Sequence, residues 1–416
     1  MVRHTFLHVG LPKSGTSYLQ AVLGENRSLL KERDGLLYPG EAWGDQVDAV
    51  RELRGLHVPP GRRAEVRGAW DRLVSEIRDW SGDALISMEW LSASTPEQIA
   101  HIGADLAGSE LHVVITVRDL ARTVPAAWQE GAQNGATWSW QEFLEQVAAD
   151  DWDATRAGGG FWRQQDMIGV LDRWLELVPP ERTHVVTVPP TGSDPDELWR
   201  RMATVLGIDA AAYDLAIVRS NASLGWESAE LMRRVNEQAR ERGVGRRDYE
   251  RAFKHHLAKR VLAARKPSES KVRLPLEYDD WVAEQAARQI EAIKVSGADV
   301  VGSLEELRPD ADHPGAPLAV ADSEAVLGAA VDALITVALA RQHDRDEHDR
   351  ELRRSEAALE RARHANSELR AEIEYRASRP LRQALIDLSA QRPAVHRARV
   401  GYWRAVNAAR RFRRSG

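Results

Sequence analysis

Residues 9–18, VGLPKSGTSY, decide the fold of this chain. An apolar run over residues 4–9 precedes them, and apolar residues at helical spacing follow from Tyr18 onward. The pattern predicts a strand, a glycine-bracketed loop and the start of a helix. Backbone N–H groups of such a loop point inward, and the helix N-terminus adds a partial positive charge, so the loop is a phosphate site.

The position of the lysine separates two kinds of phosphate loop. In nucleotide-triphosphatases the lysine directly follows the second glycine, in the pattern G-x-x-x-x-G-K-[ST]. Here Gly10 and Gly15 have that spacing, but Thr16 occupies the lysine position and Lys13 lies inside the loop. A lysine at this place is expected to point toward the bond beyond a single phosphate. The alternative is an ordinary strand-turn-helix with a surface lysine.

The segment P-K-S-G-T-S-Y resembles the 5′-phosphosulfate loop of the sulfotransferases, usually written P-K-[SA]-G-[TS]-[TS]-[WFY]. The resemblance implies a P-loop-like fold and transfer of a sulfuryl group from 3′-phosphoadenosine 5′-phosphosulfate (PAPS), with PAP as the product and no metal. It implies that Lys13 is catalytic, because it reaches the bridging oxygen on which charge develops. The donor-binding residues of the loop are then Pro12, Lys13, Ser14, Gly15, Thr16, Ser17 and Tyr18.

Short apolar strands alternate with helical segments over residues 1–308, which predicts an α/β domain with a central parallel sheet flanked by helices. The strand candidates cover residues 4–9, 84–88, 111–117 and 183–188. Ligands bind at the carboxyl ends of such strands. Gly10, Glu89 and Arg118 each follow a strand candidate, so we expect them on one rim of the sheet.

Glu89 is the candidate general base. A carboxylate on a partly buried rim suits proton abstraction from an acceptor, and Glu89 resembles the strand-end glutamate of the glycan-modifying sulfotransferases. That resemblance implies a carbohydrate or glycolipid acceptor. Cytosolic sulfotransferases use a histidine instead, but His57 and His101 do not follow strand candidates. The alternative for Glu89 is an acid stabilised by a helix dipole.

Residues 117–128, VRDLARTVPAAW, resemble the 3′-phosphate motif of the same family, R-[ND]-P-x-x-x-x-x-S-x-[WY]. The arginine and Trp128 match. Leu120 replaces the proline, and Ala126 stands where the phosphate-binding serine is expected. The residues expected to bind the 3′-phosphate are therefore Arg118 and, in compensation, Arg122 or Thr123.

Two stretches lack a clear period. Residues 40–61 predict either a substrate loop or an irregular connection. The glycine run at residues 156–160 predicts a flexible connector or, less favoured, a close backbone approach to a ligand.

The chain has 416 residues and no cysteine, which excludes disulfides, thiolate metal sites and cysteine nucleophiles. The first strand candidate begins close to Met1, and no uninterrupted apolar run approaches about 18 residues. We therefore expect a cytoplasmic protein, peripheral at a membrane if its tail binds lipid.

The C-terminal part is a helical extension of different composition. A Pro-containing linker is expected at residues 309–322, followed by a long helix at 323–375 with an imperfect heptad pattern. Self-association through 324–375 and a solvated helix packed on the domain are equal alternatives. Residues 376–416 carry eleven arginines and one acid, a net charge of +10, against −16 for the rest. This basic amphipathic tail suits a membrane surface or an acidic partner, ahead of nucleic acid and of docking on the protein's own acidic body.

Two other functions remain open on these residues. A P-loop kinase or nucleotide hydrolase predicts a lysine at position 16 and a strand-end aspartate for Mg²⁺. A catalytically inactive sulfonucleotide-binding scaffold is favoured by Ala126 and disfavoured by the presence of both Lys13 and Glu89.

Overall fold

The chain folds into two compact units, Met1–Thr336 and Val337–Gly416. The computed structural model describes residues 4–58, 60–216, 223–309, 322–378 and 380–412. The predicted linker at 309–322 lies almost wholly outside the described residues, as do Arg379 and residues 413–416 of the predicted tail.

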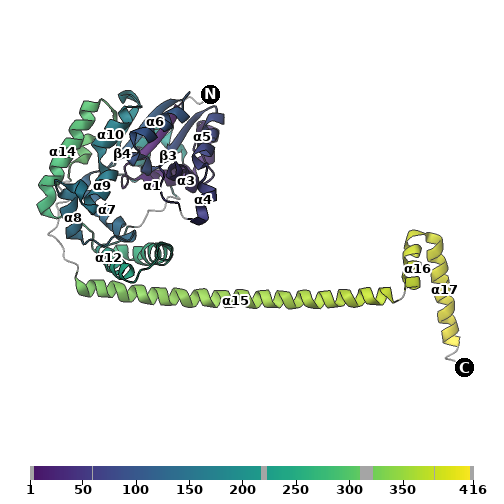
Figure 1. Ribbon diagram of the computed structural model, residues 1–416. Helices are drawn as coiled ribbons and strands as arrows, with labels where there is room; N and C mark the ends of the chain where they lie inside the picture. Colours follow the sequence, from purple (N-terminus) through teal and green to yellow (C-terminus); the bar gives the residue numbers. More distant parts are fainter. Residues whose placement is uncertain (1–3, 59, 217–222, 310–321, 379, 413–416) are drawn as a thin grey trace. The chain divides into compact units, whose positions relative to one another are not determined.

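A single parallel sheet forms the centre of the first unit, with six strands among the described residues in the order β2-β3-β1-β4-β5-β6 (Figure 1). The strands are β1 His4–Gly10, β2 Leu36–Leu37, β3 Asp83–Ser87, β4 Glu110–Val117, β5 Thr183–Thr187 and β6 Asp299–Val301. The predicted α/β class with a central parallel sheet is therefore confirmed. β2 and β6 are edge strands of two and three residues, too short to show a strand period.

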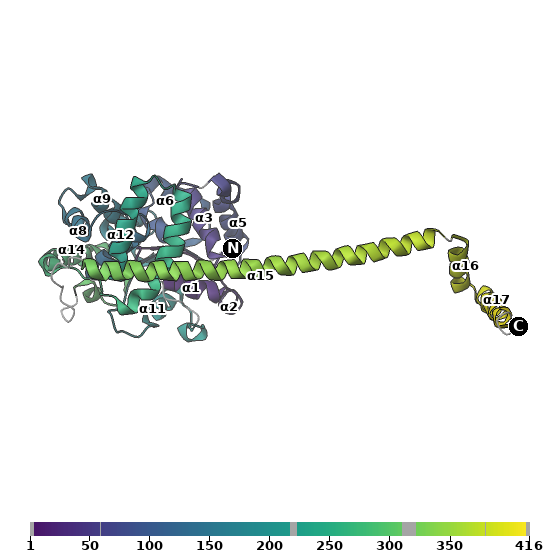
Figure 2. The same ribbon diagram turned by 90° about the horizontal axis from the view of Figure 1, so that it is seen from below.

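Alternate residues of the strands face two different cores, because successive side chains of a strand point to opposite faces. Leu7 and Ile86 face the larger core, which also contains Trp70 of α5. Phe6 and Leu85 face the other core, on the side of α1, α2 and α11 (Figure 2). Helices thus cover both faces, as the apolar strands require.

The helices of the first unit connect and cover these strands (Figure 1). They are α1 Thr16–Glu25, α2 Arg27–Arg33, α3 Trp43–Leu53, α4 Arg63–Val66, α5 Ala69–Asp79, α6 Pro96–Asp105, α7 Leu120–Gln133, α8 Trp140–Ala148, α9 Arg156–Gln165, α10 Met167–Leu175, α11 Glu197–Leu206, α12 Trp226–Glu241, α13 Arg246–Tyr249 and α14 Asp279–Ser296. A π-helix, Glu250–Leu262, packs on α7 and α12.

Half of residues 40–61 form a helix, α3, where the sequence predicted a substrate loop or an irregular connection. Two polar residues, Gln46 and Asp48, lie on its buried face and interrupt the apolar period. Gln46 accepts a hydrogen bond from the Ser87 backbone N–H (2.8 Å) and donates one to the Pro39 carbonyl (3.1 Å).

The glycine run at residues 156–160 is also not a flexible connector, since it forms the first turns of α9. A Cβ atom on Gly158 would lie 2.3 Å from the carbonyl oxygen of Gln146 and 2.7 Å from that of Trp152. Glycine is needed here because the helix approaches neighbouring backbone closely.

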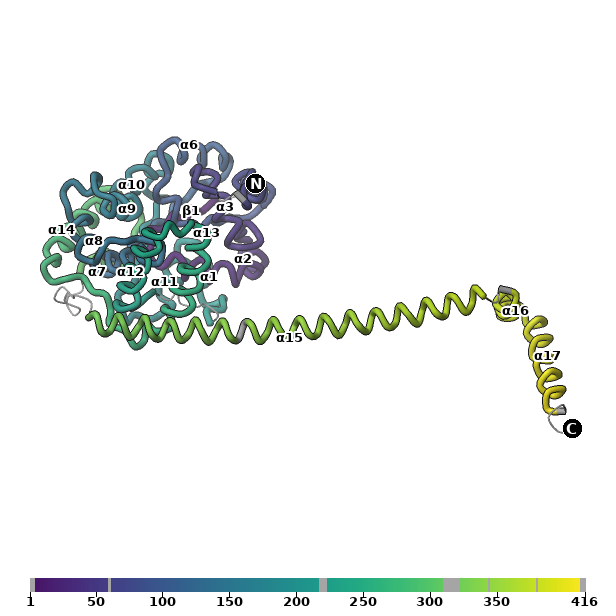
Figure 3. Tube along the Cα trace, turned by 60° about the horizontal axis from the view of Figure 1, so that its bottom comes forward, coloured from purple at the N-terminus to yellow at the C-terminus, as the bar shows by residue number. Residues whose placement is uncertain are grey.

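The C-terminal extension consists of α15 Ser323–Ala377, α16 Pro380–Gln391 and α17 Pro393–Phe412, which confirms the predicted helical character. The first turns of α15 belong to the first unit, where Val326, Ala329 and Ala333 are buried. In the second unit α16 and α17 pack on each other (Figure 3).

Among the described residues, α15 is the one helix long and apolar enough to cross a membrane by length and composition alone. Its most apolar 18-residue window has a mean hydropathy of 1.7 and is 17% buried. This corrects the expectation from uninterrupted runs, because the window tolerates up to two charged residues. The heptad residues Leu352, Leu359, Leu369 and Ile373 are exposed. Self-association through them stays a prediction, which sedimentation velocity of the full chain would test.

Candidate functional site

The loop between β1 and α1 turns through three residues with left-handed backbone: Gly10 (φ 85°), Lys13 (φ 68°) and Gly15 (φ 82°). Lys13 is the one non-glycine residue among those described with a positive φ. Such a conformation costs on the order of 1–3 kcal/mol and persists only where surrounding contacts impose it.

Those contacts come from three other elements. Gln165 at the end of α9 donates to the Pro12 carbonyl (2.7 Å), and Arg118 after β4 donates to the Lys13 carbonyl (3.3 Å). The Leu11 N–H donates to the Thr116 carbonyl (2.7 Å). The loop is therefore held by two of its carbonyl oxygens and, on the strand side, by the Leu11 N–H. This arrangement leaves its helix-side N–H groups available for an anion.

A chain of buried polar side chains lies beneath the loop. Nδ1 of His8 is 2.7 Å from the Ser87 hydroxyl, and Nε2 is 3.1 Å from the Thr116 hydroxyl. Thr116 is in turn 2.6 Å from the hydroxyl of Ser14, which donates to the Leu11 carbonyl. All four polar side chains are nearly inaccessible to solvent.

The single proton of each hydroxyl sets the direction of this chain. The Ser14 hydroxyl donates its hydrogen bond to the Leu11 carbonyl. Thr116 therefore donates to Ser14 and accepts from Nε2–H of His8. The unprotonated Nδ1 then accepts from Ser87. His8 is accordingly neutral and protonated on Nε2, in agreement with burial, which lowers its pKa to about 4.

We expect the His8→Asn variant to be less stable than His8→Gln, by about 1–3 kcal/mol in urea unfolding. The amide nitrogen of glutamine reaches the position of Nε2, whereas that of asparagine does not, and Thr116 would lose its buried donor. Equal stabilities would contradict the Nε2–H assignment.

The difference in unfolding free energy between the wild type and His8→Gln should depend on pH. The folded-state pKa of His8 lies below the value of 6.5 for an unperturbed histidine, so the unfolded chain binds the extra proton as the pH falls. The wild type should lose about 2–3 kcal/mol more stability between pH 7 and pH 4.5 than His8→Gln. The exposed His101→Gln is the control.

Glu89 lies against the loop, as the rim prediction requires. A Cβ atom on Gly10 would be 2.7 Å from Cβ of Glu89, so only glycine permits this approach. Gln20 of α1 donates to Oε2 of Glu89 (2.8 Å) and to the Ser87 carbonyl (3.2 Å), which fixes the carboxylate. The other oxygen of Glu89, Oε1, makes no hydrogen bond among the described residues.

Lys13 points toward α7, where its Nζ lies 2.9 Å from Oε2 of Glu130. Both side chains are partly exposed, at 28% for Lys13 and 45% for Glu130. An exposed pair of this kind is weak, so a bound anion can compete for the lysine. Glu130 was not predicted as a site residue, because a glutamate inside an amphipathic helix carries no sequence signal of its own.

The two arginines of the 3′-phosphate motif, Arg118 and Arg122, have different partners in the structure. Arg118 stays at the loop and is partly buried. The three guanidinium nitrogens of Arg122 donate instead to Asp119, to the Pro189 carbonyl (2.9 Å) and to the Val188 carbonyl (3.4 Å). Arg122 thus braces the ends of β4 and β5.

Thr123 and Ala126 lie on the first two turns of α7. The Thr123 hydroxyl is buried and has no hydrogen-bond partner among the described residues. Trp128, which matches the motif, is a core residue, with its ring 5.4 Å from Trp140 and 5.3 Å from Trp226.

The remaining loop residues differ in accessibility. Ser17 is exposed and Thr16 is buried at the start of α1. Ser14 differs from the expectation that its hydroxyl faces the ligand, because that hydroxyl supports the loop from below. Tyr18 lies beside the start of α11, where burial and Asp196 raise its pKa to about 12.

Comparisons with known proteins return distant likenesses. No protein-family model and no curated protein matches the chain. A sulfotransferase from Alicyclobacillus acidocaldarius is similar at 16% identity and a TM-score of 0.36, over 61% of this chain and 97% of that one. The sulfotransferase domain of the Curacin biosynthetic pathway is similar at 16% identity and a TM-score of 0.28, over 50% of this chain and 74% of that one. The functional argument therefore rests on the geometry of the site.

Proposed function

We propose that the chain is a sulfotransferase that moves a sulfuryl group from PAPS to a hydroxyl or amine of an acceptor. The observation that carries the proposal is that the Arg118 guanidinium lacks a full set of hydrogen-bond partners in the described part of the chain. Its guanidinium lies beside the loop, makes one long hydrogen bond to the Lys13 carbonyl, and has a buried Nε without a partner among the described residues.

A buried guanidinium that lacks partners is costly unless an anion is bound. Burial, and less strongly the neighbouring Arg122, lower the pKa of Arg118 to about 10 although Asp119 lies nearby, so a bound anion would stabilise the charged guanidinium. A donor with phosphates at both its 5′ and 3′ positions supplies that charge. We assign the 5′-phosphate to the N–H groups of the loop and the 3′-phosphate to Arg118.

Lys13 and Glu89 divide the chemistry between them. Sulfuryl transfer in line between two oxygens has a loose transition state, so positioning and charge stabilisation dominate, as in phosphoryl transfer. Lys13 neutralises the bridging oxygen as its bond to sulfur breaks and PAP leaves. Glu89 accepts the proton of the acceptor hydroxyl as the new bond to sulfur forms. No step requires a metal.

The acceptor class follows from Glu89 by analogy. A glutamate at this strand end resembles the glycan-modifying members of the family, so we propose a carbohydrate or glycolipid acceptor. Transfer of labelled sulfate from PAPS onto an extract of the cells that make the chain, followed by glycosidase digestion, would test the class.

Calorimetric titration with PAP tests the donor assignment. We expect PAP binding at nanomolar to micromolar concentrations and no heat with ATP–Mg²⁺. Arg118→Met should weaken PAP binding by about 10- to 100-fold, since a charge-assisted hydrogen bond contributes on the order of 1.5–3 kcal/mol.

Arg122→Met is the matched control, because the structure commits that arginine to Asp119 and to two carbonyls. A preference for ATP–Mg²⁺ would favour a phosphotransferase and contradict the proposal. PAP binding with no label transfer to any extract would favour the inactive scaffold.

A further inference from the structure

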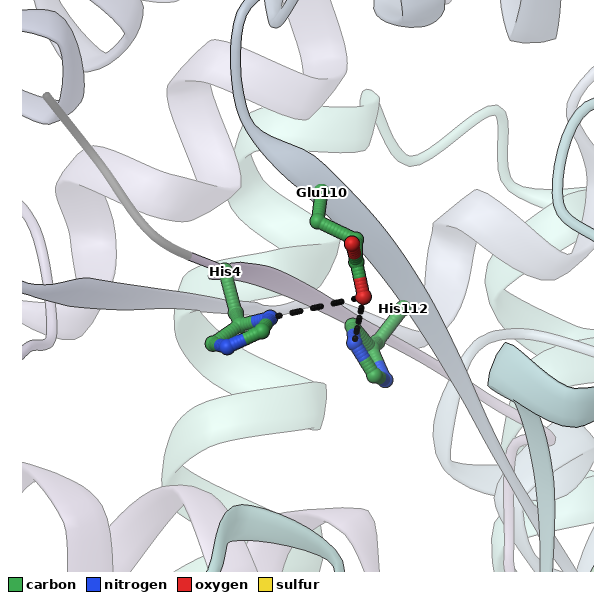
Figure 4. Close-up of side chains that lie close together, drawn as sticks. All are labelled: His4, Glu110 and His112. Atoms are coloured by element: carbon green, nitrogen blue, oxygen red, sulfur yellow. Dashed lines mark ion pairs between the residues drawn. The ribbon is translucent and has the colours of Figure 1, made fainter.

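A second group of polar side chains, His4, Glu110 and His112, lies at the end of the sheet where the strands begin, opposite to the loop (Figure 4). His4 opens β1 and pairs in register with Glu110, which opens β4, and His112 follows two residues later on the same face. β1 runs six residues further to Gly10, so this edge is roughly 20 Å from the loop. The proposed sulfuryl transfer does not use it.

The three side chains converge without forming hydrogen bonds. Nδ1 of His4 is 3.8 Å from Oε1 of Glu110, and Nε2 of His112 is 3.6 Å from the same oxygen. All three atoms lie within 4.8 Å of one another. Ligands of a tetrahedral ion at about 2.0–2.2 Å stand about 3.3–3.6 Å apart, so an ion fits with small adjustments.

The far side of His112 is organised as an outer shell for such an ion. Nδ1 of His112 is 2.9 Å from Nε2 of His184, and Nδ1 of His184 is 2.8 Å from Oδ2 of Asp299. The rings of the two histidines are parallel, with centroids 5.3 Å apart. Histidines that bind metals pass their other ring proton to a carboxylate or a similar acceptor, as this series does.

Proton positions follow from the acceptor at the end of the series. Asp299 only accepts, so His184 carries its proton on Nδ1 and accepts at Nε2 from Nδ1–H of His112. Nε2 of neutral His112 is then a bare lone pair directed at the carboxylate of Glu110. A cation between these two electron-rich atoms satisfies both of them.

Burial data agree with this reading. Nδ1 of His4 and Nε2 of His112 are both inaccessible to solvent and have no hydrogen-bond partner among the described residues. Buried polar atoms of this kind are satisfied by a bound ion or water.

We propose that His4, Glu110 and His112 bind one Zn²⁺ ion, with water as the fourth ligand. Two imidazoles and one carboxylate suit zinc, whereas Mg²⁺ and Ca²⁺ prefer oxygen ligands alone. The ion joins β1 to β4 where both strands begin. It stabilises the sheet from the end opposite to the phosphosulfate loop.

The test uses the full chain, stripped with a chelator and titrated with ZnCl₂ in a calorimeter. We expect one ion per chain, with affinity reduced at least 10-fold in Glu110→Gln and 10- to 100-fold in Asp299→Asn, which alters only the outer shell. Both side chains are half exposed, at 52%, so neither change threatens folding.

His101→Gln is the matched control, because His101 also contacts an acid, Asp105, at 3.0 Å but has no third ligand. Its affinity should equal that of the wild type. Co²⁺ in place of zinc should give the intense visible absorption of a tetrahedral site, and zinc should raise the Tm of the wild type but not of Glu110→Gln.

Absence of binding to the wild type would overturn the proposal, as would unchanged affinity in Glu110→Gln and Asp299→Asn or a weak octahedral Co²⁺ spectrum. PAP binding should be unchanged in Glu110→Gln, so the metal site and the proposed function can fail separately.

Discussion

Replacing Lys13 by methionine is expected to lower kcat for sulfuryl transfer by roughly 10²–10³. Methionine keeps the length of the side chain and removes the charge that meets the bridging oxygen. Lys13→Arg should recover only part of the rate, because a planar guanidinium does not replace a compact ammonium at one oxygen. Initial rates with labelled PAPS and an accepting extract would measure both.

PAP distinguishes a catalytic from a binding role for Lys13. PAP lacks the sulfuryl group, so its affinity should change far less than kcat does in Lys13→Met. Lys31→Met, which removes an ammonium 4.8 Å above the Trp80 ring, is the control for loss of a lysine elsewhere. An unchanged kcat, or a loss of PAP affinity equal to the loss of rate, would exclude the proposed role.

The backbone of Lys13 gives an independent reason to expect a large effect. Its left-handed conformation is held by Gln165 through Pro12 and by Arg118 through the Lys13 carbonyl. Strained non-glycine residues cluster at functional sites, where neighbouring contacts impose the conformation. The same strain predicts that Lys13→Gly folds at least as well as the wild type while losing activity.

The sequence was sufficient to predict the four longest strands of the sheet and the meeting of Gly10, Glu89 and Arg118 at one rim. Uniformly apolar strands indicate a parallel sheet with helices on both faces. Polar residues that directly follow such strands lie together at the carboxyl ends of the strands. The close approach of Glu89 to Gly10 and the bond from Arg118 to Lys13 both follow from this rule.

The sequence was not sufficient to predict which hydrogen-bond partner a polar side chain takes when several are within reach. Ser14 fits the phosphate pattern, yet its hydroxyl turns inward because Thr116 and the Leu11 carbonyl are buried beneath it. The sequence offered both Arg118 and Arg122 for the 3′-phosphate, yet of these two only Arg118 remains without a full set of acceptors. Such choices depend on the packing of three elements at once.

The group at the other edge escaped prediction because it depends on strand register. His4 meets Glu110 only in the observed pairing, and a slip of one residue would turn His112 to the opposite face. A signal was nevertheless present. Polar residues occupy the first or second position of four strands, at His4, Glu110, His184 and Asp299, and parallel strands bring their starts together as surely as their ends.

Glu89→Gln is expected to lower kcat by about 10²–10⁴, the range for loss of a general base. The amide is nearly isosteric, and its oxygen can still accept the hydrogen bond that Gln20 donates to Oε2. Folding and donor binding should therefore survive, and PAP affinity should stay close to that of the wild type. The loss of kcat is then due to the missing proton acceptor and not to a change in folding or donor binding.

Glu130→Gln makes this experiment decisive, because Glu130 is the other carboxylate that contacts the loop, through Lys13. If Glu89 is the base, Glu130→Gln keeps most of its kcat, and it binds PAPS more tightly because Lys13 is released from its ion pair. If Glu130 is the base, Glu130→Gln loses kcat and Glu89→Gln keeps it, and the strand-end assignment is wrong. The paired measurement of kcat and of PAPS affinity separates these cases, because Glu89 is held by Gln20 and is not part of the Lys13 ion pair.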